Sequence, residues 1–347
     1  MNTGRTARIE ILQIIRLFAA SMIILYHSGL IGGRGYFGVQ IFFVLSGFLA
    51  YWTTRKPVSA GRYLIRRLIR LVPLYWAFTA LTFVLLTLRP GLSNMSDGDP
   101  LHFLLSLLFI PYKGAAGYTL PILAVGWTMQ YEVFFSLLFA LSLLISHRHR
   151  GLVCGLLLLA LLAVGLWLKP KNVVIRFYTD RHLFDFFLGL LAGSVWRKLR
   201  EAVPEDRTVL SGLPRSLKAP ACAALSLLAL GALVFLVLDL RFSFKLHQAV
   251  RLGIPAAVLI FTLLLLAERV SFPSKLLALS SMTYSIFLVE YFTTSVYKRL
   301  FPEPLSLPLA VLTAAVLFAV TFALAVIPWQ LIEVRLTSRL KRIFLPS

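Results

Sequence analysis

An arginine and a histidine, Arg16 and His27, lie in the first long apolar stretch of the chain. In a helix, their eleven-residue separation is a rotation of ~1100°, about 20° past three full turns, so both side chains share one helix face. They are ~16 Å apart along the axis, too far for direct contact. If this apolar stretch spans a membrane, the shared face carries a fixed cation and a proton acceptor at two different depths. Ionisable groups inside a membrane are functional candidates. The plainer alternative is that Arg16 extends to the cytoplasm and His27 satisfies a buried hydrogen bond, but the shared face favours function.

A carboxylate lies about ten residues inside another apolar stretch, at Glu132 in the segment 126–132. At that depth a carboxyl group must be protonated, paired or hydrated. Arg16 and His27 are the expected partners, and a plain salt bridge between helices is as consistent with the sequence as direct chemistry. Trp127 and Tyr131 precede Glu132 and could line a sugar-binding site, although aromatic residues are common at membrane interfaces in any case.

Six Lys and Arg residues occupy positions 55–70. Arg62, Arg66 and Arg70 recur at i, i+4 and i+8, on one face of a helix. Such a face could grip phosphate groups at the cytoplasmic surface. It could equally anchor the chain on anionic lipid, which is the interpretation that the sequence alone favours.

Two further candidates lie at the outer side of apolar stretches. Arg181 belongs to the dense polar and aromatic segment 176–182, and Glu290 falls at an outer depth comparable with that of His27. Either residue could face a water-filled cavity or mark the membrane boundary. We find no metal-ligand spacing, glycine-rich phosphate loop or serine nucleophile elbow.

The elements that must position these residues are membrane-spanning helices. Of the 347 residues 59% are hydrophobic and only 14% are charged, against ~25% charged in soluble domains, which excludes a soluble protein. The segment 101–111 is apolar but too short to cross, which indicates a surface or re-entrant helix. We therefore expect an all-α, polytopic integral membrane protein with about ten transmembrane helices. Their expected ranges are 10–30, 36–53, 71–89, 121–146, 151–168, 182–197, 219–240, 249–267, 277–297 and 307–331.

The charge of the chain, a formal +21, follows largely from this topology. With the N-terminus in the cytoplasm, 22 of the 35 Lys and Arg residues lie in cytoplasmic segments and 12 in outer segments, and Arg16 lies within the first span. Because cytoplasmic loops carry the excess of positive charge, both termini are expected in the cytoplasm. The cations then need no nucleic-acid partner.

Six segments, in order along nearly the whole chain, together resemble the membrane-bound acyltransferase-3 family, in its exopolysaccharide and glycan O-acetyltransferase branch. They are the Arg16–His27 spacing, the second-span segment 38–48, the Arg-rich entry 66–76, the Trp-Thr-x-x-x-Glu block in 125–132, the segment 281–288 and the basic end 333–342. Two positions depart from the pattern. Gln40 stands where family members often have an acidic residue, and Glu290 where they often have histidine.

The resemblance implies one transmembrane domain over 1–347 that transfers an acyl group, most simply acetyl from cytoplasmic acetyl-CoA, to a hydroxyl of an exopolysaccharide or other envelope glycan, including a lipid-linked sugar. This places the chain in the plasma (inner) membrane, with membrane lipids as further partners. No metal and no tightly bound cofactor is expected. A thioester is already activated, so the reaction needs a base and a dry, polarised site.

His27 is the expected base, and an acyl-histidine intermediate is an alternative route. Glu132 would orient His27 or pair with Arg16, and Arg16 would steady the donor's phosphates or its thioester. The residues expected to hold the donor's nucleotide are Arg66, Arg67 and Arg70. The residues expected to contact the acceptor are Trp127, Tyr131, Arg181, Tyr284 and Glu290.

Two functions from other classes stay open at the level of the sequence. One is a transporter or flippase of a glycan or lipid-linked intermediate, which ten spans would permit. Against it, no repeated halves and no paired broken helices are visible. The other is a non-catalytic membrane partner in polysaccharide assembly.

Overall fold

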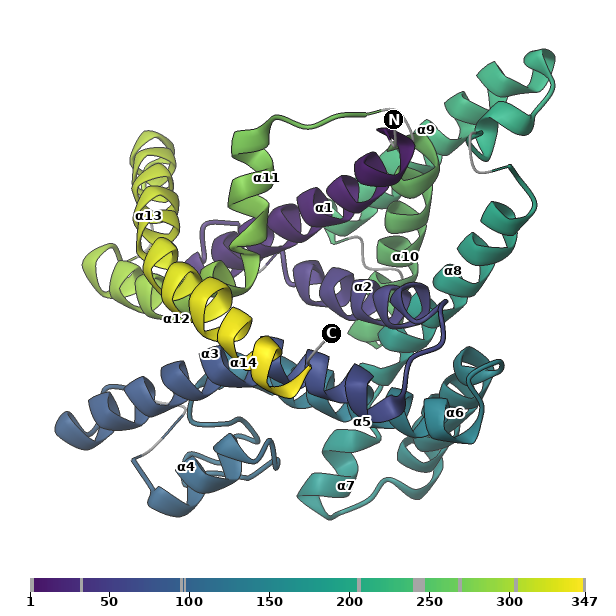
Figure 1. Cartoon of the computed structure of the whole chain (residues 1–347). Helices are drawn as coiled ribbons and strands as arrows, with labels where there is room; N and C mark the ends of the chain where they lie inside the picture. The colour runs from purple at the N-terminus through teal and green to yellow at the C-terminus, as the bar shows by residue number, and fades with distance from the viewer. Residues whose placement is uncertain are drawn as a thin grey trace. The chain divides into compact units, whose positions relative to one another are not determined.

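The computed structural model describes residues 3–31, 34–93, 96, 98–204, 207–239, 247–267, 270–302 and 305–345, with side chains from residue 10 onward. The chain, whose helices are labelled in Figure 1, divides into two compact units. Unit 1 comprises Met1–Arg55 and Phe184–Phe322, and unit 2 comprises Lys56–Leu183 and Ala323–Ser347. The single domain expected over 1–347 stays a prediction.

Unit 1 is built from helices around α1, which packs against α2, α10, α11 and α12. Its helices are α1 (Thr3–Ser28), α2 (Phe37–Thr53), α8 (Leu183–Glu201), α9 (Arg215–Leu238), α10 (Gln248–Leu266), α11 (Ser274–Ser281), α12 (Thr283–Leu300) and the first part of α13 (Leu307–Pro328). Helices α11 and α12 meet at a bend of 65°. The α1 face toward this bent pair carries the residues described below.

Unit 2 is built around α3, which packs against α4, α5 and the C-terminal helices. Its helices are α3 (Ala60–Leu88), α4 (Pro100–Leu107), α5 (Trp127–Ile145), α6 (Arg150–Leu168), α7 (Val173–Tyr178), the π-helical segment Trp329–Leu336 and α14 (Thr337–Phe344). Apart from one isolated antiparallel bridge between Lys113 and Thr119, the regular structure of the described residues is helical. The all-α fold is confirmed.

Seven helices in the described part of the chain are long and apolar enough to cross a membrane, and the bent pair α11–α12 makes an eighth if it forms one span. The chain is therefore a polytopic membrane protein. The other two of the ten expected spans also form helices. However, α2 has only 17 residues, and α8 carries Asp185 in its first turn and Lys198 and Arg200 in its last. Their length and polarity set them apart from the seven.

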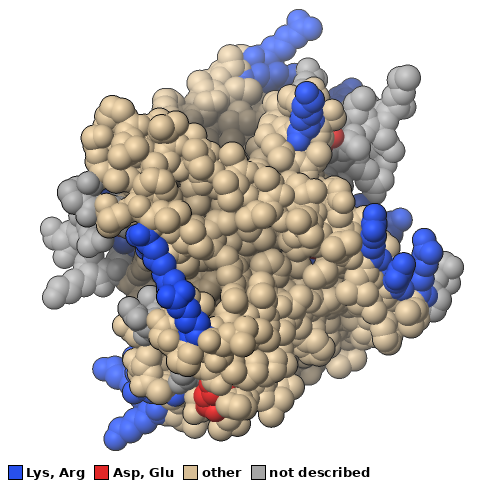
Figure 2. All heavy atoms as spheres, turned by 90° about the vertical axis from the view of Figure 1, so that its left-hand side faces the viewer, with Lys and Arg blue, Asp and Glu red and all other residues tan. Residues whose placement is uncertain are grey.

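The surface is consistent with a lipid environment. Only 11% of an 18-residue apolar stretch of α9 is buried, and Leu227 of that helix is 69% exposed. Figure 2 shows a face dominated by uncharged residues, with Lys and Arg gathered in a few separate places. In the hydrocarbon core of a bilayer, a helix satisfies its own backbone hydrogen bonds and can expose apolar side chains such as leucine to lipid.

Helix α2 is held by close backbone contacts through glycine. A Cβ atom on Gly47 would lie 2.2 Å from the Phe186 carbonyl oxygen, and one on Gly189 would lie 2.1 Å from the Val44 carbonyl oxygen. Glycine at both positions lets the backbones of α2 and α8 approach as small residues do between membrane helices.

Replacing Gly189 with leucine should therefore separate α2 from α8. We expect a loss of at least the ~1–3 kcal/mol typical of overpacking, because the obstacle is backbone rather than a movable side chain. Thermal unfolding of the detergent-solubilised protein measures this. Gly231→Leu is the matched control, since nothing lies within 4 Å of a Cβ atom there. Equal melting of the two variants would refute the close crossing.

Candidate active site

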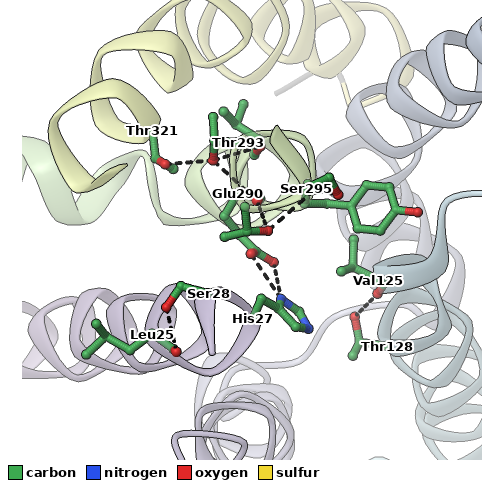
Figure 3. A network of polar contacts seen from close by, with 12 residues as sticks. Leu25, His27, Ser28, Val125, Thr128, Glu290, Thr293, Ser295 and Thr321 are labelled. Carbon is green, nitrogen blue, oxygen red and sulfur yellow. Dashed lines mark hydrogen bonds and ion pairs between the residues drawn. The ribbon is translucent and has the colours of Figure 1, made fainter. Parts of the chain in front are cut away.

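His27 and Glu290 form a hydrogen-bonded pair within unit 1 (Figure 3). The Nδ1 atom of His27 lies 2.9 Å from Oε1 and 3.0 Å from Oε2 of Glu290. His27 stands in the last turn of α1, and Glu290 comes from α12, which packs against α1. The Glu290 side chain is fully buried, whereas that of His27 is 32% exposed. A buried carboxylate is costly without a partner, so the pair compensates Glu290 and leaves the imidazole reachable.

Hydroxyl groups fix the backbone around Glu290. Thr294 Oγ1 donates to the Glu290 carbonyl oxygen at 2.6 Å, and Thr293 Oγ1 lies 2.7 Å from Thr321 Oγ1 of α13 (Figure 3). The Thr293–Thr321 hydrogen bond joins α12 to α13, and such bonds between membrane helices hold the helices in register. These bonds hold the part of α12 that carries the Glu290 carboxylate toward His27.

Arg16 lies on the same side of α1 as this pair. Gln13 accepts a hydrogen bond of 3.2 Å from Ser280 of α11, so two contacts with the bent pair mark this face of α1. At ~100° per residue, Arg16 is about 60° from Gln13 and about 20° from His27 around the helix axis. Arg16 is half-buried. Tyr284, also half-buried, opens α12 just after the bend.

Glu132 is bonded within unit 2. Arg67 Nη2 donates to Glu132 Oε2 at 2.8 Å, and Arg67 Nε donates to Ser136 Oγ at 3.3 Å, which ties α3 to α5. The side chains of Arg67 and Glu132 are only 16% and 8% exposed. The expected pairing of Glu132 with His27 or Arg16 stays a prediction, because those two residues belong to unit 1.

The three arginines expected to hold the donor point in two directions. Arg66 and Arg70 are exposed, whereas Arg67 is turned toward α5. Around the helix axis Arg67 lies ~100° from Arg66 and ~60° from Arg70, and its bonds to Glu132 and Ser136 hold its side chain against α5. Only the exposed pair is presented to solvent.

The acceptor candidates of unit 2 gather at the start of α5. Trp127 is half-buried and its ring lies 5.8 Å from that of Tyr131 in an edge-on arrangement, while Tyr131 itself is 2% exposed. Arg181 is exposed. His182 packs against both rings, although it was not among the candidates; its place in the polar segment 176–182 was the available signal.

If His27 is the base of the expected acyl transfer, Glu290→Gln should lower the turnover of that reaction by about 10²–10⁴-fold. The glutamine amide keeps the shape of the carboxylate but not the charge that stabilises a protonated imidazole. Initial rates on the solubilised protein measure this. Glu201→Gln is the matched control, since that carboxylate is 63% exposed and pairs only with Arg197 among the described contacts. Wild-type turnover in Glu290→Gln would show that the Glu290 carboxylate has no part in the reaction.

These features define a multi-pass helical membrane protein with a histidine–carboxylate pair held between two of its helices. The chain belongs to the acyltransferase family: the family model described as "Acyltransferase domain" matches residues 9–329. The resemblance expected from the six segments is confirmed.

Curated relatives support this assignment. The exopolysaccharide production protein ExoZ of Rhizobium meliloti is 33% identical over 167 residues, which is 47% of this chain and 51% of the relative. The O-acetyltransferase OatA of Staphylococcus aureus is 29% identical over 206 residues, covering 52% of this chain and 34% of the relative. The peptidoglycan O-acetyltransferase OatA of Listeria monocytogenes is 27% identical over 224 residues, covering 57% and 36%. The matched region thus spans about half of ExoZ and about a third of the OatA proteins, and no solved structure matches the chain.

Proposed function

We propose that the chain is an O-acetyltransferase that moves an acetyl group from acetyl-CoA to a hydroxyl of an exopolysaccharide or another envelope glycan, including a lipid-linked sugar. The observation that carries the proposal is the His27–Glu290 pair in a chain of the acyltransferase family. The names of the relatives, an exopolysaccharide production protein and O-acetyltransferases, support the class of acceptor.

In the proposed reaction His27 is the general base. An ionised Glu290 can only accept hydrogen bonds, so it holds the proton on Nδ1 and leaves Nε2 to take the proton of the acceptor hydroxyl. The hydroxyl oxygen attacks the thioester carbonyl carbon, the C–S bond breaks, and the imidazolium returns the proton to the leaving thiolate. An acyl-histidine intermediate is the alternative route, in which Nε2 itself attacks the thioester.

The donor is proposed to bind through cations at the cytoplasmic side. Arg67 would have to give up its bonds to Glu132 and Ser136 to reach a ligand, so we place the donor's charged nucleotide on Arg66 and Arg70. Arg16, half-buried on the His27 face of α1, is proposed to steady the phosphates or the thioester end.

We propose that α2 and α8 complete ten membrane helices in the plasma (inner) membrane with both termini in the cytoplasm. The distribution of 22 cytoplasmic and 12 outer cations supports this orientation. It places the Arg-rich start of α3 on the cytoplasmic side, where acetyl-CoA is made, and His27 toward the outer side.

A transporter or flippase of a glycan is the second candidate, and the 65° bend between α11 and α12 favours it, because transporters use broken helices at their binding sites. The two functions differ in whether a thioester is cleaved. Purified protein in lipid nanodiscs is given acetyl-CoA with and without an envelope-glycan fraction, and release of free thiol is recorded. We expect glycan-dependent thiol release. A protein that neither binds nor cleaves acetyl-CoA across a panel of glycans would instead favour the transporter.

A further inference from the structure

A second histidine–carboxylate pair lies in unit 2, in the segment between α7 and α8. His182 Nδ1 is 2.6 Å from Asp180 Oδ1, and the His182 backbone N–H donates to the same oxygen at 3.1 Å. The His182 side chain is 15% exposed and that of Asp180 is 36% exposed. Neither residue takes part in the reaction proposed above.

Aromatic rings surround this pair. The His182 ring lies 5.1 Å from Trp127 and 5.5 Å from Tyr131. Tyr131 is fixed in turn, because its ring stacks on Phe177 at 4.3 Å and its hydroxyl donates to the Phe177 carbonyl oxygen at 2.8 Å. Tyr131 is therefore a buried support, whereas Trp127 and His182 are the partly accessible members of the cluster.

The charge of the segment that carries His182 is strongly positive. Residues 169–181 contain Lys169, Lys171, Arg176 and Arg181, all exposed, against Asp180 as the acidic residue of the segment. The carboxylate of Asp180 is engaged by His182. The segment therefore carries a net positive charge, which attracts anions.

This combination suits a sugar that carries an acid group. An aromatic ring covers the apolar C–H face of a pyranose, a few fixed polar groups select its hydroxyls, and arginine binds a carboxylate or phosphate in a bidentate manner. We propose that Trp127, His182 and Asp180, with the nearby cations Arg176 and Arg181, form an acceptor subsite for an acidic glycan. The acceptor class rests on the proposed function, whereas the subsite itself can be tested by binding alone.

The test is equilibrium binding of tetragalacturonate, and of uncharged cellotetraose, to the full-length protein in nanodiscs. We expect tighter binding of tetragalacturonate, and a loss of about tenfold or more in Trp127→Ala and His182→Ala. His182→Gln serves as a second variant that keeps a hydrogen-bonding side chain if the alanine variant does not fold. The double variant Arg176→Ala/Arg181→Ala should bind the two tetrasaccharides equally.

Two controls carry the same substitutions outside the cluster. Trp167, 85% exposed at the end of α6, is changed to alanine, and exposed Arg148 is changed likewise. Both should bind as the wild type does. Wild-type affinity in Trp127→Ala and in both His182 variants, or no preference for the acidic tetrasaccharide in the wild type, would overturn the subsite. Binding that follows the expected pattern without any glycan-dependent thiol release would keep the subsite and refute the acetyltransferase.

Discussion

In a His27→Ala variant we expect acyl transfer to fall by about 10²–10⁴-fold while the protein still inserts into the membrane. The substitution removes the proposed base, and the transfer assay with acetyl-CoA and glycan measures the loss. It also leaves the fully buried Glu290 without its imidazole partner, so a folding defect has to be separated from a chemical one.

His27→Gln makes that separation. The glutamine amide can still donate a hydrogen bond to Glu290, but it cannot accept the hydroxyl proton at neutral pH. We expect a folded, monodisperse and inactive protein. His149→Ala is the control, because that histidine is exposed in the loop before α6. A well-folded His27→Gln variant with wild-type transfer would exclude His27 as the base.

The second large effect concerns the Arg67–Glu132 pair. Removing Glu132 by alanine leaves Arg67, which is only 16% exposed, without its carboxylate, and breaking a buried ion pair on one side costs about 3–5 kcal/mol. We expect a marked fall in the melting temperature of the solubilised protein. The double variant Arg67→Met/Glu132→Leu should recover much of the loss, because apolar residues of similar volume replace both charges.

Activity of the double variant then tests the predicted catalytic role of Glu132. A stable and active double variant would limit Glu132 to holding α3 against α5. A stable but inactive one would support a part for Glu132 or Arg67 in the reaction. Melting of Glu132→Ala at the wild-type temperature would show that the bond between Arg67 and Glu132 contributes little.

The helices were largely predictable because apolar length determines where a chain can cross a membrane. The expected span 71–89 covers only the apolar part of α3. The helix itself begins at Ala60, where Ser59 caps it by accepting from the Arg62 backbone N–H. Over its 29 residues α3 is about 43 Å long, more than the hydrocarbon thickness of a bilayer, so a hydropathy window finds only its apolar part. The i, i+4, i+8 recurrence of Arg62, Arg66 and Arg70 correctly indicated that the helix continues before the span.

Pairing between helices was the harder part of the site. Periodicity correctly places Arg16 and His27 on one face of α1, but the partner of His27 lies 263 residues away in the sequence. Local patterns do not contain that contact, because it depends on how α1 packs against α12. The comparable depths of His27 and Glu290 were the available indication, and Glu290 was instead assigned to the acceptor.

We propose that this chain acetylates an envelope glycan through His27. Mass spectrometry of envelope glycans tests it most directly, in cells that lack the chain and express either the wild type or the folded His27→Gln variant. We expect glycans from wild-type cells to carry the added mass of an acetyl group, lost on mild alkaline treatment, and glycans from His27→Gln cells to lack it. Identical glycan acetylation in cells with the wild type, with His27→Gln and with neither would contradict it.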